Sequence, residues 1–151
     1  MLSSAGSIVV SVVILGYIVW NQIRVRRVRT AMVLPVILIV LGAGDLSRYV
    51  GRHGLSAADM AVLAVSFLFV AIGLGAVRAY TVRLWQDGGN VLRQGTYVTI
   101  LLWLAGAAIH VGVDSLVHSA AATYLLYLGL TLGSQRLVLA ARAKRLLPWG
   151  Q

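Results

Sequence analysis

The side chains of this sequence that could do chemistry are a few histidines and aspartates in two regions. His110, Asp114 and His118 recur at intervals of four, and Asp45 and His53 lie in an earlier stretch. Residues four apart lie about 6 Å apart along one helix face, so His110 and Asp114 can act together. An imidazole beside a carboxylate can bind a divalent metal or relay a proton, and a single imidazole can ligate haem. These five residues are therefore candidates for a ligand or proton site.

A purely structural role explains the same residues. His110 can bond Asp114 or a backbone carbonyl, and Asp45 can pair with Arg48 one turn away. Polar groups commonly hold helices together inside a membrane bundle. The spacing matches no recognised metal-ligand motif, so we predict neither a metal nor another cofactor.

Catalytic motifs are missing from the sequence. It contains no Cys, which excludes disulfides, thiolate metal sites and a Cys-x-x-Cys-His haem-attachment motif. It also has no activated nucleophile pair, no phosphate-cradling loop and no paired carboxylates on one helix face. We therefore predict no catalytic residue and no enzymatic activity.

The composition is that of a membrane protein. Of the 151 residues, 60% are hydrophobic and 11% are charged, and the mean hydropathy is +0.89. The chain therefore has too few polar residues to cover the surface of a soluble globular protein. The net charge of +9 comes almost entirely from arginines beside apolar stretches. This placement favours anionic lipid headgroups as the partner, at about 1 kcal/mol per basic residue near the surface, and argues against a nucleic acid.

The apolar stretches predict an all-α membrane fold, a single domain over residues 1–151 with about five transmembrane helices. Each stretch approaches the roughly 20 residues needed to cross a bilayer. The last two are short, and the polar break at residues 114–118 can instead cap a re-entrant pair. The predicted spans are residues 7–20, 30–49, 58–79, 97–113 and 119–135.

The basic residues predict the orientation of these spans. Eleven of the 13 fall in three clusters on one side, and only Arg48 and Arg52 fall on the other. Basic residues accumulate on the cytoplasmic side, so we expect a bacterial inner (plasma) membrane protein with its N-terminus outside and its C-terminus in the cytoplasm. Residues 1–6 carry no side-chain charge, so we expect the first span to be retained and not cleaved as a signal peptide. The residues expected at headgroups are Arg24, Arg26, Arg27, Arg29, Arg142, Lys144 and Arg145.

The polar segment at residues 80–95 predicts a small cytoplasmic β-hairpin between the third and fourth spans. Polar and apolar residues alternate on both sides of Asp87-Gly88-Gly89, which is a strong hairpin signal. The tight turn requires a positive φ at Gly88 or Gly89.

Three further motifs concern the helices. Ser56 followed by Asp59 resembles a capping box at the start of the third span. Residues 136–149 continue the last helix as a basic extension that we expect at the inner membrane surface. Gly129-xxx-Gly133 and Ala108-xxx-Gly112 allow close helix approach, either within one chain or in a homodimer.

One segment has a recognisable order of features: a helix end with Gly and Arg, an Asp-Gly hairpin, and an apolar helix with Trp. The residues that carry this order are Gly75, Arg78, Asp87, Gly88, Arg93, Gly95 and Trp103. The segment resembles the CcdC-like family of small bacterial multi-pass membrane proteins, named after a neighbour of cytochrome c biogenesis genes. The resemblance implies a fold and a membrane location. That family has no settled biochemical role, so no functional residue is transferred.

The sequence favours a non-enzymatic accessory or regulatory membrane protein that acts through helix contacts with a partner or in a homo-oligomer. In the predicted orientation Asp45, His53, His110, Asp114 and His118 fall at or near the outer side, and we call them the outer His/Asp cluster. The alternative function is a small transporter or permeation unit for a cation, a proton or a lipophilic molecule, using this cluster. A metal- or haem-binding membrane protein is the third possibility.

Overall fold

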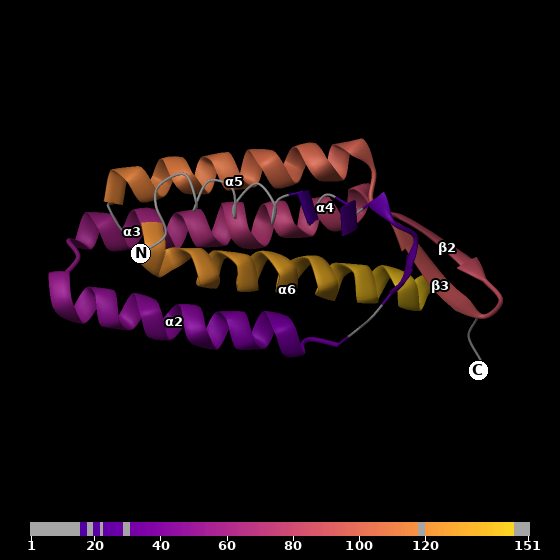
Figure 1. The fold of residues 1–151 in the computed structure, drawn as a ribbon, viewed down its shortest axis with the longest axis horizontal. Coiled ribbons are helices and arrows are strands. Elements are labelled where there is room, and N and C mark those ends of the chain that lie inside the picture. The colour runs from indigo at the N-terminus through magenta and orange to yellow at the C-terminus, as the bar shows by residue number, and fades with distance from the viewer. Residues whose placement is uncertain (1–15, 18–19, 22, 29–30, 118–119, 147–151) are drawn as a thin grey trace.

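The computed structural model describes residues 16–17, 20–21, 23–28, 31–117 and 120–146, which form a helical bundle with a small sheet at one end (Figure 1). The helices are α2 (Val33–His53), α5 (Tyr97–Val117) and α6 (Ala120–Leu146), together with a continuous helix made of α3 (Ala57–Ser66), a π-helical segment η1 (Phe67–Gly73) and α4 (Leu74–Thr81). The strands are β1 (Arg26–Arg27), β2 (Arg83–Asp87) and β3 (Asn90–Gln94).

The predicted hairpin is confirmed. β2 and β3 are antiparallel and pair from Arg83 opposite Gln94 to Asp87 opposite Asn90. The two residues of the turn, Gly88 and Gly89, have φ values of 53° and 78°. A side chain is penalised in this left-handed region, so glycine at both positions explains the tight turn.

A third strand, which the sequence pattern did not predict, completes the sheet. β1 pairs with β3, with Arg26 opposite Arg93, and the sheet order is β1-β3-β2. The Val28 amide continues this pairing by donating to the Val91 carbonyl at 2.9 Å. The short stretch after the predicted first span is thereby fixed to the hairpin.

The capping box at the start of α3 is also confirmed. Ser56 Oγ accepts from the Asp59 amide at 3.1 Å, and the Asp59 carboxylate accepts from the Ser56 amide at 3.3 Å. Gly54, which ends α2, has a φ of 68°. A short connection between α2 and α3 is therefore specified by local residues.

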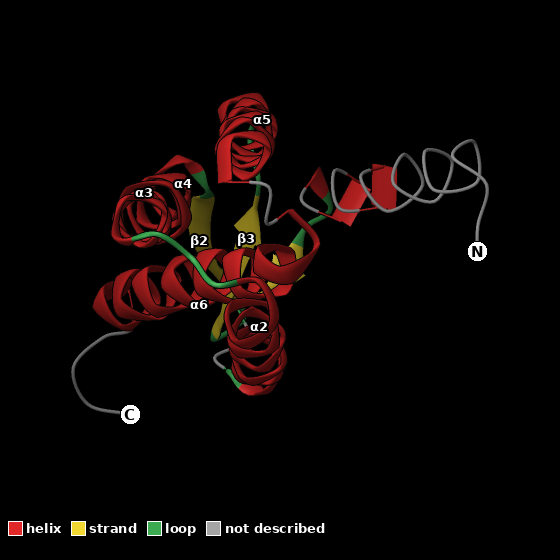
Figure 2. Ribbon diagram, turned by 90° about the vertical axis from the view of Figure 1, so that its left-hand side faces the viewer, coloured by secondary structure: helices red, strands yellow, loops and turns green. Residues whose placement is uncertain are grey.

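The central element is α6, which lies between α2 and the other helices (Figure 2). Its approach to α2 is close because a Cβ at Gly129 would stand 2.7 Å from the Ile39 nitrogen. A Cβ at Gly42 would likewise stand 2.6 Å from the Leu126 Cα. The Gly129-xxx-Gly133 motif thus packs within the chain, against α2, whereas a Cβ at Gly112 would meet nothing within 4 Å.

The interior of the bundle holds many polar side chains beside apolar ones, and its outer surface is largely apolar. Seven polar or charged residues are buried in the described part of the chain, namely Ser66, Arg78, Thr99, His110, Thr123, Thr131 and Gln135. Large hydrophobic side chains are exposed along the outer faces of α2, α3, η1 and α5. Contiguous apolar surface of this kind is typical of an interaction with lipid or with another protein.

Two of the described helices, Val33–His53 and Ala57–Thr81, are long and apolar enough to cross a membrane, and the apolar part of α5, Tyr97–Val113, is shorter. The predicted span at residues 7–20 falls mostly outside the described residues. The five-span arrangement therefore stays a prediction. The basic extension after residue 135 continues α6 to Leu146, and it packs against the bundle through Leu139, which forms a small core with Ala79 and Val82.

Candidate functional site

A cavity of about 430 Å³ opens at the sheet end of the bundle, and we call it the arginine pocket. Four of its lining residues are arginines from three separate elements: Arg26 and Arg27 from β1, Arg93 from β3 and Arg136 from α6. The remaining lining residues are Asn21, Val28 and Leu139. None of the lining residues is acidic.

The sheet and α6 together position these side chains. Pairing of β1 with β3 sets Arg26 opposite Arg93. Gln94 Nε2 donates to the Ile23 carbonyl at 3.1 Å, which ties the chain before β1 to β3. Arg136 donates to the Ala31 carbonyl and so links α6 to the start of α2.

The pocket concentrates positive charge. Burial lowers the pKa of the Arg93 guanidinium below its ordinary value, and the nearby charges of Arg136 and Arg26 lower it further. Four like charges around one cavity repel each other, and a bound anion relieves that repulsion. Guanidinium groups bind phosphate in a planar, bidentate geometry, so the pocket suits a phosphate-bearing ligand.

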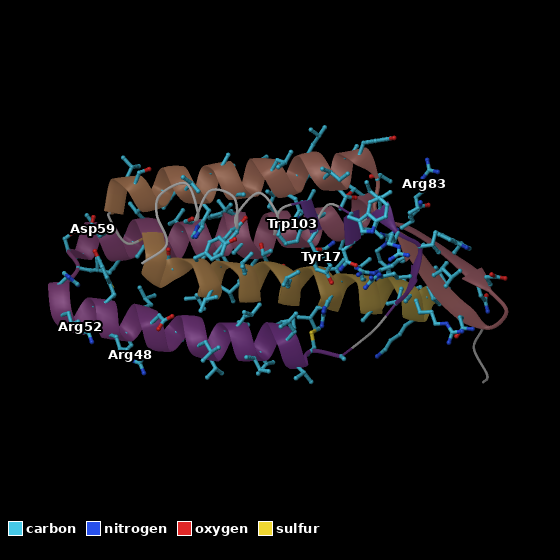
Figure 3. All side chains as sticks on the ribbon, viewed as in Figure 1. Tyr17, Arg48, Arg52, Asp59, Arg83 and Trp103 are labelled. Carbon is cyan, nitrogen blue, oxygen red and sulfur yellow. The ribbon has the colours of Figure 1, made fainter. Side chains whose placement is uncertain are left out.

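A second polar group lies deep between the helices. Arg78 on α4 is fully buried, and its Cζ lies 4.1 Å from the ring centroid of Trp103 on α5. Its Nη2 donates to Thr131 Oγ1 on α6 at 2.8 Å, and Thr131 Oγ1 donates to the Ala71 carbonyl at 2.8 Å. Trp103 is itself buried, and it is labelled in Figure 3.

The outer candidates do not form one site. Asp45 and His53 lie on the surface of α2: Asp45 pairs with Arg48 at 3.8 Å, and the His53 ring stacks on Tyr49 at 4.7 Å. The Asp45–Arg48 pair expected for a structural role is thus present. His110 is instead buried, with its ring stacked on Tyr127 at 4.0 Å.

The pairing of His110 with Asp114 stays a prediction, because the Asp114 side chain and His118 lie outside the described residues. Within the described part of the chain, no three His, Cys, Asp or Glu residues lie close enough to hold a metal ion.

The residues expected at lipid headgroups lie in different surroundings. Arg26 and Arg27 line the arginine pocket, and Arg24 lies over the Trp20 ring at 5.9 Å. Lys144 and Arg145 are exposed in the last turn of α6, as expected for headgroup contact. Arg29 lies outside the described residues.

Arg142 corrects the headgroup expectation, because it turns inward. Its Nη1 donates to the Ala79 carbonyl and, at 3.1 Å, to the Val82 carbonyl. These two carbonyls are at the end of α4, where the helix leaves its last acceptors unpaired. Arg142 therefore caps α4 within the chain.

Sequence reasoning missed Arg78, Arg93 and Arg136 as site residues. The charge pattern counted Arg78 among the basic residues on the cytoplasmic side, yet it shares a helix stripe with Ala71, Gly75 and Val82, all of which are buried. That stripe of small residues is a signal that the arginine faces the interior. For Arg93 and Arg136 no comparable signal exists, because Arg93 joins the pocket through the pairing of β1 with β3, and Arg136 joins it from α6.

Comparison of the chain with protein-family models, with curated proteins and with solved structures gives no match. The resemblance to the CcdC-like family stays a prediction.

Proposed function

We propose that the chain is a non-enzymatic multi-pass membrane protein that binds an anionic, phosphate-bearing lipid headgroup in the arginine pocket. The observation that carries this proposal is the convergence of four arginines on one cavity whose lining includes no acidic residue. The volume of about 430 Å³ falls within the usual range for small-ligand sites. Basic pockets beside transmembrane helices on the cytoplasmic side are typical sites for anionic lipid headgroups.

The distribution of apolar and polar side chains supports the membrane location. The outer faces of the helices are apolar, as lipid contact requires, and the polar groups are inside, where helices can satisfy each other. Charges also concentrate at the ends of the long axis: Arg48, Arg52 and Asp59 lie at one end, and Arg83 lies at the other (Figure 3).

In the proposed orientation, five spans cross a bacterial inner membrane with the N-terminus outside. The sheet and the arginine pocket then lie on the cytoplasmic side, since most basic residues belong to that end. Headgroup phosphates lie at the same depth as these helix ends. A lipid bound between β1, β3 and α6 would hold together β1, near the start of the chain, and α6, near its end. The proposal therefore includes an accessory or regulatory role that depends on the bound lipid.

The arginine pocket is favoured over the outer His/Asp cluster as the functional site. The described members of that cluster lie on the surface of α2 and inside the bundle, so they share no cavity with one another. The arginine pocket brings its residues together across the fold.

The test compares two charge-matched variants of the full chain in neutral detergent. Arg93→Gln with Arg136→Gln removes two pocket charges, and Lys144→Gln with Arg145→Gln removes two exposed charges from the last turn of α6. Each protein is titrated with a short-chain phosphatidylglycerol, and bound lipid is counted by native mass spectrometry. Loss of two contacts worth about 1 kcal/mol each weakens binding about 30-fold in the pocket variant.

The control variant should bind like the wild type. Equal weakening in both variants would mean that overall charge, not the pocket, attracts the lipid. Titration with short-chain phosphatidylcholine and with inorganic phosphate separates headgroup charge from free phosphate, and saturation by phosphate alone at equal concentration would contradict a lipid site.

A further inference from the structure

Arg78 is an arginine whose hydrogen-bonding capacity is only partly used. Its Nη2 donates to Thr131 Oγ1 at 2.8 Å and its Nε donates to the Leu74 carbonyl at 3.3 Å. One face of the guanidinium lies over the Trp103 ring. Its Nη1 is buried and has no hydrogen-bond partner. A guanidinium has five donors, so at least the two hydrogens on Nη1 point at no acceptor.

Within the described part of the chain, no carboxylate lies close to Arg78. Asp59 lies about 28 Å away along the continuous α3–η1–α4 helix, and Asp114 lies about 16 Å beyond Trp103 along α5. Asp87 is exposed at the hairpin turn, next to Gly88. The only other acidic residue in the sequence is Asp45, which pairs with Arg48. A buried cation without a counter-charge is strongly unfavourable, and an ionisable residue within a membrane is a functional candidate by default.

Two further buried donors lie on α5 and α6, the helices that contact Arg78 through Trp103 and Thr131. Trp103 Nε1 and Gln135 Nε2 are both buried without a hydrogen-bond partner. Trp103 supplies the ring under the guanidinium, and Gln135 lies one turn after Thr131 on α6. An indole and an amide nitrogen can only donate. The group formed by Arg78, Trp103 and Gln135, which we call the Arg78 cluster, therefore has unused donors and one uncompensated positive charge.

We propose that the Arg78 cluster is a binding site for a single carboxylate, separate from the arginine pocket. One carboxylate supplies the missing negative charge, and its two oxygens accept from guanidinium, indole and amide donors. The single positive charge of Arg78 matches the single negative charge of one carboxylate. The carboxylate can belong to a small soluble acid or to a fatty acid that enters from the surrounding lipid, since both present the same group.

Ligand-induced stabilisation tests the site. The full chain in neutral detergent is melted in titrations with sodium acetate, with oleate and, at matched ionic strength, with sodium chloride. A ligand that binds only the folded state raises the melting temperature with concentration. We expect a rise with carboxylate that chloride does not reproduce, together with a change in tryptophan emission because Trp103 lies against the guanidinium. Response to oleate alone assigns a fatty acid, and response to acetate as well assigns a small acid.

Three variants make the test specific. Arg78→Lys keeps the charge but loses the planar fork, so the carboxylate concentration at half-effect should rise at least about tenfold. Trp103→Phe keeps an aromatic face but loses a donor, and it should abolish the emission change. Arg93→Gln with Arg136→Gln, which disables the arginine pocket, should leave the carboxylate response unchanged. An Arg78→Lys response equal to wild type, an equal response to chloride, or no response to either carboxylate would overturn the proposal.

Discussion

The close approach of α2 and α6 can be tested with one methyl group. Gly42 and Gly44 are two residues apart on α2, yet their surroundings differ completely. A Cβ at Gly42 would stand 2.6 Å from the Leu126 Cα and 2.8 Å from the Leu125 carbonyl carbon, and a Cβ at Gly44 would meet nothing within 4 Å. Gly42→Ala and Gly44→Ala therefore add the same methyl group to the same helix. The methyl group clashes with α6 only at position 42.

The magnitude follows from the geometry. The new carbon at position 42 is about 0.8 Å short of the 3.4 Å at which ordinary contact with the Leu126 Cα begins, and it lies closer still to the Leu126 nitrogen. Its neighbours are backbone atoms, so the two helices must separate, and overpacking of this kind costs about 1–3 kcal/mol. Both variants gain up to about 1 kcal/mol of helix propensity. The propensity gain cancels in the comparison, so Gly42→Ala should be less stable than Gly44→Ala by about 1–3 kcal/mol.

Thermal unfolding in neutral detergent, followed by far-ultraviolet circular dichroism, measures this difference. For a chain of this length, about 1–3 kcal/mol corresponds to a melting temperature lower by about 2–12 °C. Gly44→Ala should melt at or slightly above the wild-type temperature. Melting of both variants within about 1 °C of each other would refute the α2–α6 packing argument.

Two further predictions concern the hairpin and the orientation. Gly89→Val should destabilise the hairpin by about 1–3 kcal/mol because Gly89 has a φ of 78°. Gly89→Asn should cost less, since Asn tolerates the left-handed region. Amide hydrogen exchange in β2 and β3 measures both variants, and equal protection of the two would contradict the turn geometry. The chain has no native Cys, so His53→Cys and Asn90→Cys can be labelled singly in intact cells with an impermeant maleimide. We expect labelling at position 53 and none at position 90, and the reverse pattern would invert the proposed topology.

Features set by neighbours in the sequence were predictable. The hairpin follows from Asp87-Gly88-Gly89 and the alternation around it, and the start of α3 follows from Ser56 and Asp59. In each case a few adjacent residues satisfy their own backbone groups or permit a positive φ. Such signals do not depend on what the rest of the chain does.

The candidate sites were not predictable because they depend on distant pairings. β1 has only two residues, and it forms a strand because it pairs with β3, which lies over 60 residues later in the sequence. Without that pairing, Arg26 and Arg93 look like separate loop charges. Arg78 illustrates the other difficulty: a charge count assigns it to the membrane surface, whereas the small residues on its helix face direct it inward.

The central position of α6 has a consequence for biogenesis. α2 finds its main packing partner in α6, and α4 finds there the Thr131 hydroxyl that binds Arg78. Chains are synthesised from the N-terminus at about 5–20 residues per second, so in the proposed membrane arrangement these earlier helices spend several seconds in the bilayer before α6 is made. During that interval Arg78 lacks the Thr131 hydroxyl that accepts its hydrogen bond, and the face of α2 that carries Gly42 is not covered by α6. The helix that holds the bundle together is therefore synthesised after the helices that pack on it. A nascent chain that stops before residue 120 has α2 and α4 without their common packing partner, and the insertion and quality-control machinery meets it in that state.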